Sequence, residues 1–103
     1  MIARVAAFEG VNVEAAAATM DEAIPIIRGL VEGLAGYRGM LELGAANGKV
    51  MSIVFFDTEA DAAAAEPTFD EEMPSALGHL FTDEWAGRRV SVDVYTVGAD
   101  ERR

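Results

Sequence analysis

His79 is the only histidine in the chain, and a histidine can exchange a proton near neutral pH. Ser75, His79 and Asp83 lie four residues apart, so a helix would bring them to one face. A hydrolytic triad also needs a sharply presented nucleophile and an oxyanion hole, and the chain has no G-x-S-x-G motif. An exposed polar face explains the three residues better. His79 alone stays a candidate general base or haem ligand, and otherwise it faces solvent or the rim of a cleft.

Three adjacent acids, Asp70, Glu71 and Glu72, precede His79 and carry the hard oxygen ligands that metal ions such as Ca²⁺ prefer. Three consecutive side chains at the start of a helix cannot all converge on one ion. Their charge suits the positive end of a helix dipole, which explains them more simply. We therefore expect no metal site here.

Two arginines, Arg4 and Arg38, each lie within a mostly apolar stretch of an acidic protein. An ion pair with Glu42 or a neighbouring acid would account for them. The alternative is a guanidinium directed at an anionic or phenolate group in a pocket between a sheet and its helices. Aromatic side chains could line such a pocket or simply fill a core, and they are Tyr37, Phe55, Phe56, Phe69, Phe81, Trp85 and Tyr95.

The elements that must position these residues can be predicted from apolar spacing. Residues 2–8 predict a short strand that is apolar on both faces and interrupted only by Arg4, and Asn12 is a plausible N-cap for a long amphipathic helix. Pro25 lies within this helix and predicts a kink. The apolar stripe of the helix consists of Val13, Ala17, Met20, Ile24, Ile27, Val31 and Leu34.

The second half of the chain begins with a hairpin. Residues 37–45 and 49–57 are two strands joined by a turn that contains Asn47 and Gly48, a strong hairpin signal. Thr58 is the predicted N-cap of a further helix, which Pro67 ends. A second helical piece follows over residues 74–81, and the last strand covers residues 88–97.

This order of strand, helix, strand, strand, helix, strand predicts an α+β fold of the ferredoxin-like βαββαβ type, a four-stranded antiparallel sheet with two helices on one face. The length of 103 residues allows one domain, which we assign to residues 1–98. Residues 99–103 form a polar C-terminal tail that is expected to fray.

The strands are apolar on both of their faces. In residues 50–56, Val54 and Phe56 point one way while Met51, Ile53 and Phe55 point the other. Two helices can cover only one face, and an uncovered apolar sheet exceeds what monomers usually expose. A homodimer in which two sheets pack face to face is therefore expected.

The run "GYRGMLEL", followed by a turn and "KVMSIVFFDTEADA", resembles the hairpin and helix start of the dimeric α/β barrel proteins related to antibiotic biosynthesis monooxygenases. The resemblance implies the strand order and the sheet-to-sheet dimer described above. Members of that family include cofactor-free oxygenases that act on polycyclic phenols or quinols, and haem-degrading enzymes.

Haem degradation is disfavoured because the residues that it needs are not in their places. Haem degraders have an Asn in the first strand, where this chain offers Ala6 or Ala7, and Asn12 falls in the following loop. They also place a Trp before a His, whereas Trp85 follows His79. The resemblance therefore carries no catalytic residue over to this chain by position, and we expect no cofactor.

Composition limits the partners. The net charge of −10 repels phosphate backbones and anionic lipids, so neither nucleic acid nor a membrane is an expected partner. The chain has no cysteine, and no apolar run long enough for a bilayer span or a signal peptide, so we expect a cytoplasmic protein.

Two functions remain open at this point. The first is a cofactor-free monooxygenase of small aromatic or polyketide-like substrates, with His79 as base and Arg38, Tyr37, Phe56 and Trp85 as pocket residues. The second is a non-catalytic small-molecule-binding or assembly module of the same fold.

Overall fold

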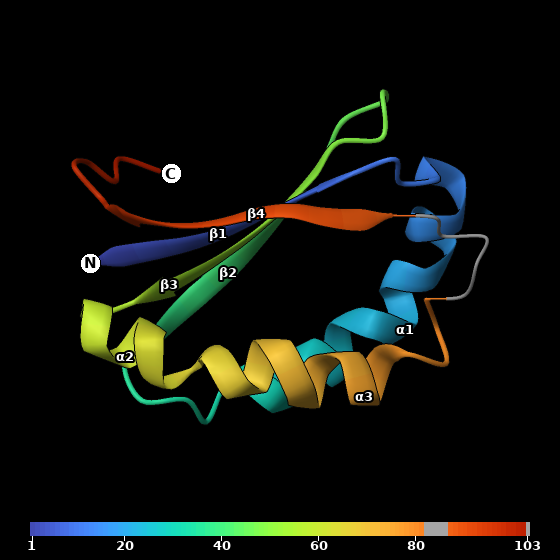
Figure 1. Ribbon diagram of the computed structural model, residues 1–103. Helices are drawn as coiled ribbons and strands as arrows, with labels where there is room; N and C mark the ends of the chain where they lie inside the picture. Colours follow the sequence, from blue (N-terminus) through green and yellow to red (C-terminus); the bar gives the residue numbers. More distant parts are fainter. Residues whose placement is uncertain (82–86, 103) are drawn as a thin grey trace.

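The computed structural model describes residues 1–81 and 87–102, which form one antiparallel sheet and a helical layer (Figure 1). The strands lie in the order β2-β3-β1-β4, which is the ferredoxin-like order that the sequence predicts. In chain order the elements are β1 (Ile2–Glu9), α1 (Val13–Val31), β2 (Tyr37–Gly44), β3 (Val50–Phe56), α2 (Glu59–Ala64), η1 (Thr68–Glu72), α3 (Met73–Leu77) and β4 (Arg88–Thr96).

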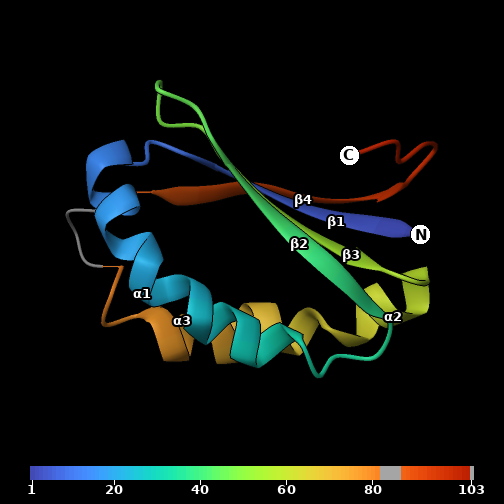
Figure 2. The same cartoon turned by 180° about the vertical axis from the view of Figure 1, so that it is seen from behind.

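The helices all lie on one side of the sheet, and the opposite side carries no helix in either view (Figures 1 and 2). None of the helices in the described part of the chain is both long enough and apolar enough to cross a bilayer. The predicted architecture of two helical segments on one face of a four-stranded sheet is therefore confirmed.

Helix α1 begins where the sequence predicts, because Asn12 Oδ1 accepts a hydrogen bond from the Ala15 N–H at 3.2 Å. The predicted stripe is only partly right. Its C-terminal half packs on the sheet and buries Ile27 and Val31, but Val13 at its start is 39 % exposed. Pro25 lies inside the helix, which bends visibly in Figure 2.

The hairpin between β2 and β3 closes as predicted, with the Ala45 N–H bonded to the Lys49 carbonyl at 2.8 Å. Gly48 has a φ of 86°, and a Cβ there would lie 2.9 Å from the Val11 carbonyl oxygen, so both conformation and space require glycine. The hairpin fixes the register that places Glu42 directly opposite Ser52.

The second helical segment, which consists of α2, η1 and α3, differs from the prediction. Thr58 caps α2 by accepting from the Asp61 N–H at 3.1 Å, as expected. Pro67 does not end the helical path, because its φ of −58° and ψ of −34° are helical and η1 follows it directly. At the other end, α3 stops at Leu77 instead of reaching residue 81.

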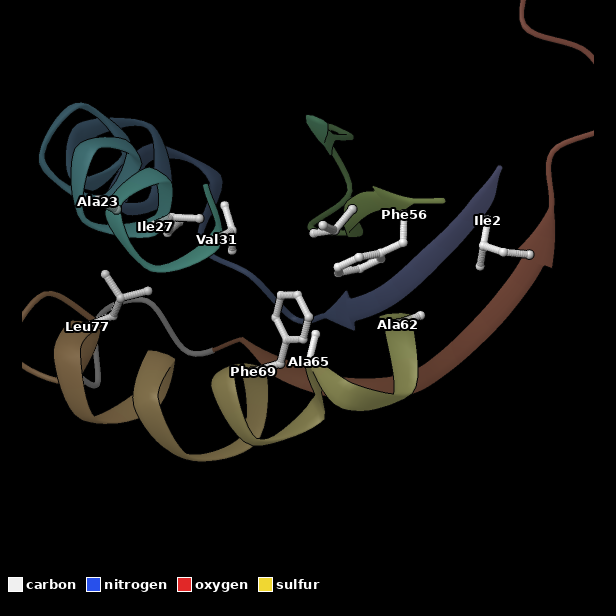
Figure 3. Close-up of a cluster of buried hydrophobic side chains, with 10 residues drawn as sticks. Ile2, Ala23, Ile27, Val31, Phe56, Ala62, Ala65, Phe69 and Leu77 are labelled. Carbon is white, nitrogen blue, oxygen red and sulfur yellow. The ribbon is translucent and has the colours of Figure 1, made fainter. Parts of the chain in front are cut away.

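The main core lies between the sheet and the helices, and Figure 3 shows its buried side chains converging from both layers. Phe56 of β3 meets Phe69 of η1 edge to face, with ring centroids 6.4 Å apart. Ala62 and Ala65 are buried, so small side chains let the second helical segment approach the sheet closely.

The opposite face of the sheet has a smaller apolar cluster of Ala3, Val5 and Phe55, with Leu41, Ile53 and Val97 packed against it. Large apolar side chains around this cluster are exposed, Met51 by 40 % and Tyr95 by 55 %. In the C-terminal tail, the Arg102 guanidinium carbon lies 5.1 Å from the Phe55 ring centroid. We call this helix-free side of the sheet the open face.

Candidate functional site

A cavity of about 490 Å³ lies between the sheet and the helices α1, η1 and α3. Its volume falls within the range of roughly 300–1,000 Å³ that is usual for small-molecule sites. The apolar part of the wall comes from both layers and consists of Phe8, Met20, Ile27, Val50, Phe69, Met73, Leu77 and Phe81. Aromatic and methionine side chains of this kind can adapt to a flat apolar ligand.

A π-helical turn shapes one wall of the cavity. In η1 the Met73 N–H bonds to the Thr68 carbonyl five residues earlier, which makes this turn wider than an α-helical one. Phe69 is buried against the core while the next residue, Asp70, is exposed at the rim, and both line the cavity. Turns of this type occur often at functional sites.

Two polar side chains from neighbouring strands lie in the sheet wall of the cavity. The Ser52 hydroxyl on β3 donates a hydrogen bond to Glu42 Oε1 on β2 at 2.6 Å, and both residues are half-buried. Burial raises the pKa of the Glu42 carboxyl, and the hydrogen bond from Ser52 lowers it in part. The cavity thus holds a carboxyl group that releases its proton less readily than an exposed one.

An ion pair marks the rim. Arg89 Nη1 on β4 donates to Asp70 Oδ1 on η1 at 3.1 Å, and both side chains are well exposed. The cavity therefore runs from a charged rim at the surface to a floor of buried apolar groups.

Arg4 lies in the core on the helix side of β1. It is 2 % exposed, its Nε donates to Glu66 Oε1 at 2.8 Å, and its guanidinium carbon lies 3.9 Å from the Phe69 ring centroid. It is not among the residues that line the cavity. Arg4 therefore links β1 to the second helical segment through Glu66, and its guanidinium packs against the Phe69 ring.

The ion pairs predicted for the two strand arginines exist, but with other partners than Glu42. Arg4 pairs with Glu66, and Arg38 pairs with Asp57 at 2.6 Å. Glu42 takes part in no ion pair within residues 1–81 and 87–102, because its side chain points into the cavity wall beside Ser52.

The residues that the sequence predicts as site residues do not gather at one place. His79 is exposed in the turn after α3, and Arg38 is exposed beside Asp57. Tyr37 packs at the edge of the main core, where burial and the Glu32 carboxylate raise its pKa. Phe56 is buried in that core, and Trp85 lies outside the described residues. None of the first four lines the cavity, and their predicted roles stay predictions.

Sequence reasoning missed Glu42 and Ser52 as cavity residues. A signal for them exists, because Glu42 lies two residues from Met40 and Ser52 two residues from Val54. Both therefore share the strand face whose apolar side chains point toward the helices. Polar groups at inward-facing positions of a strand are unusual enough to mark a site.

Solved structures with the same architecture are found by structural comparison. One is a protein provisionally named an antibiotic biosynthesis monooxygenase from Nitrosomonas europaea, with a TM-score of 0.63 at 17% identity, covering 96% of this chain and 100% of its own. A similarly named protein from Bordetella bronchiseptica gives a TM-score of 0.68 at 15% identity and covers 95% and 97%.

A third such structure, from Deinococcus radiodurans, gives a TM-score of 0.65 at 12% identity and covers 100% and 98%. No sequence model of a protein family and no curated protein matches the chain. At these identities the likeness shows the fold, so the chain has the fold of the antibiotic biosynthesis monooxygenase type, as the sequence resemblance predicts.

Proposed function

We propose that the cavity between the sheet and the helices binds a small, flat, apolar molecule and that the protein oxidises it with dioxygen, without a cofactor. The single observation that carries this proposal is the cavity itself, whose wall is apolar except for Glu42, Ser52, Asp70 and Arg89 among the described residues. The names of the structural relatives point to the same chemistry.

In this proposal the substrate supplies all four electrons. A ring CH₂ group next to an aromatic system loses a proton to a base, and the resulting anion reacts with dioxygen to give a peroxide. Loss of water from the peroxide leaves a carbonyl group, so that one oxygen atom enters the product and the other leaves as water. The apolar walls would exclude bulk water and orient the substrate for this reaction.

The base predicted from the sequence is His79, which the structure places outside the cavity wall. A His79→Ala variant tests that role directly, because a turn residue with an exposed side chain can be replaced with little effect on folding. Loss of oxygen uptake at unchanged stability would support His79 as the base, and full activity would exclude it.

The open face of the sheet supports a homodimer. Monomeric proteins of 11.0 kDa expose about 5,600 Å² by the usual scaling with mass, whereas this chain exposes 6346 Å². A second copy packed over the Phe55 cluster would cover the exposed apolar side chains of Met51 and Tyr95.

A second candidate function is a non-catalytic small-molecule-binding module, in the cytoplasm as the sequence suggests. The observation in its favour is that the cavity brings together no nucleophile and base in hydrogen-bonding contact other than Ser52 with Glu42, within residues 1–81 and 87–102. Binding would then occur without consumption of oxygen.

Thermal unfolding with a panel of anthrones, quinols, flavin and haem, followed by oxygen uptake, separates these functions. A ligand at 100 times its dissociation constant adds about 2.7 kcal/mol to the free energy of unfolding. Stabilisation by an anthrone or quinol together with oxygen uptake would support the oxygenase. Stabilisation without oxygen uptake would support the binding module. A silent panel would contradict the oxygenase and favour an assembly module or a module for another ligand.

A further inference from the structure

Glu42 and Ser52 form a polar pair that neither the packing of the core nor the ion pairs explain. They face each other across the β2-β3 ladder, and the Ser52 hydroxyl donates to Glu42 Oε1 at 2.6 Å. Within residues 1–81 and 87–102, Glu42 Oε2 has no hydrogen-bond partner. The arginines of the same region are engaged elsewhere, Arg4 with Glu66 and Arg89 with Asp70.

A half-buried carboxyl without a cation costs stability in its charged form, which is why burial raises its pKa. A carboxyl group that burial perturbs in this way, in the wall of a cavity, is a candidate for binding a partner that arrives from outside. The cavity offers that partner space, because both Glu42 and Ser52 lie in its wall.

We propose that Glu42, held in place by Ser52, is the group by which the cavity recognises the hydroxyl end of an apolar ligand and accepts its proton. Ser52 fixes one carboxyl oxygen, which leaves Oε2 to accept the hydrogen bond of a ligand O–H group. In the transfer step the ligand O–H bond breaks, a new O–H bond forms at Glu42 Oε2, and the electron pair stays on the ligand oxygen. The negative charge thereby moves from the carboxylate to the ligand.

The charges around the cavity sharpen the predicted selectivity. Among residues 1–81 and 87–102, the other charged groups that line the cavity are Asp70 on η1 and Arg89 on β4, and they neutralise each other at the rim. A ligand that carries its own carboxylate would meet Glu42 with like charge and without a free cation. The cavity should therefore prefer a neutral hydroxyl compound to both its hydrocarbon and its carboxylate analogue.

This inference rests on the proposed ligand site and is tested with three probes of the same apolar body: naphthalene, 1-naphthol and 1-naphthoate. Titrations of the intact protein should show 1-naphthol binding roughly tenfold more tightly than naphthalene, the effect of one good hydrogen bond. Binding of 1-naphthoate should be the weakest of the three. Glu42→Leu should keep naphthalene binding and reduce the preference for 1-naphthol to about one.

The pH dependence of the preference tests the proton-accepting role. In the wild type, the preference for 1-naphthol over naphthalene should increase with pH as Glu42 ionises and becomes the stronger acceptor. Glu42→Gln should keep part of the preference, because its amide oxygen also accepts, but lose the pH dependence. Asp70→Asn should retain the pH dependence of the preference. If that variant loses it, Asp70 at the rim is the titrating group, and the proposed role of Glu42 is overturned.

The outcomes distinguish failure of the inference from failure of the proposed function. If naphthalene and 1-naphthol bind the wild type and Glu42→Leu with the same preference, the cavity binds ligands but Glu42 does not select them. If none of the three probes binds the wild type, the cavity is not a site for such ligands, and the proposed function fails together with the inference.

Discussion

The two faces of the sheet are built from alternate residues of the same strands, yet they differ in what they hold. The helix-covered face carries the main core, the part-buried Arg4–Glu66 pair and the cavity with Glu42 and Ser52. The open face carries a smaller cluster around Phe55, with apolar neighbours that reach into solvent.

This difference is what supports the two proposed kinds of partner. A concave apolar space with a few polar groups suits a small molecule, which those groups can orient. A broad apolar surface, with its few polar groups at the margin, suits another protein surface of the same kind. The neighbouring residues Phe55 and Phe56 point to opposite faces and therefore allow the two roles to be tested separately.

The largest effect is expected for Phe56→Ala. Phe56 is completely buried in the main core, so its truncation should cost about 3–5 kcal/mol in the free energy of unfolding, whatever the protein concentration. The matched variant Phe55→Ala should lower thermal stability in a way that depends on protein concentration, as expected for a dimer interface. Chemical unfolding at two concentrations measures both, and a concentration-independent loss in both variants would contradict the assigned roles of the two faces.

Met51→Glu should break the dimer while the fold persists. It places a charge on the open face, twice in a two-fold interface, and an unpaired charge buried there should cost at least about 3 kcal/mol of association. Light scattering should then report 11.0 kDa instead of twice that mass. Ala63→Glu adds the same charge at an exposed position of α2 and should leave the dimer intact. If Met51→Glu has the wild-type mass, the open face is not the interface.

Glu42→Gln should change how stability depends on pH. The folded protein holds the Glu42 proton more tightly than the unfolded chain. The resulting contribution to the free energy of unfolding is fully present below about pH 4.5 and is lost as the pH rises through the raised pKa of Glu42. The variant should therefore gain stability over the wild type with increasing pH, by about 1.4 kcal/mol for each unit of the shift. Glu14→Gln, at an exposed position of α1, is the control, and parallel pH profiles for wild type and Glu42→Gln would refute the effect.

The smallest effect is expected at the rim, for Arg89→Gln. The Asp70–Arg89 pair is exposed, so its coupling in a double-mutant cycle with Asp70→Asn should be about 0.2–1 kcal/mol and should decrease with added salt. A coupling well above 2 kcal/mol that resists salt would mean that the pair closes the cavity instead of marking its edge.

Much of the fold was predictable because its signals are local. The Asn12 and Thr58 caps, the Asn-Gly hairpin and the two-sided strands each depend on neighbouring residues, and all are present. The helical path through Pro67 was not predicted, because proline is accepted in the first turn of a helix and a π-helical turn has no simple sequence signal.

The candidate site was much less predictable. A cavity forms where side chains from distant segments leave a space unfilled. The spacing of apolar residues in a sequence does not reveal such a space. Glu42 was considered only as a partner for an arginine, since the competing acids Glu66 and Asp57 could be placed only after the helices were positioned. His79 was a candidate base only because a histidine can exchange a proton near neutral pH. Its position in the fold depends on where α3 ends.

Methyl NMR of the methionines during a titration with 1-naphthol tests the central claim most directly. Met20 and Met73 line the cavity, whereas Met51 lies on the open face. We expect the ligand to shift the signals of Met20 and Met73 and to leave Met51 unchanged, while dilution of the free protein shifts Met51 and leaves the two cavity methionines unchanged. A ligand that moves Met51 and leaves the two cavity methionines in place would contradict the division of roles between the two faces.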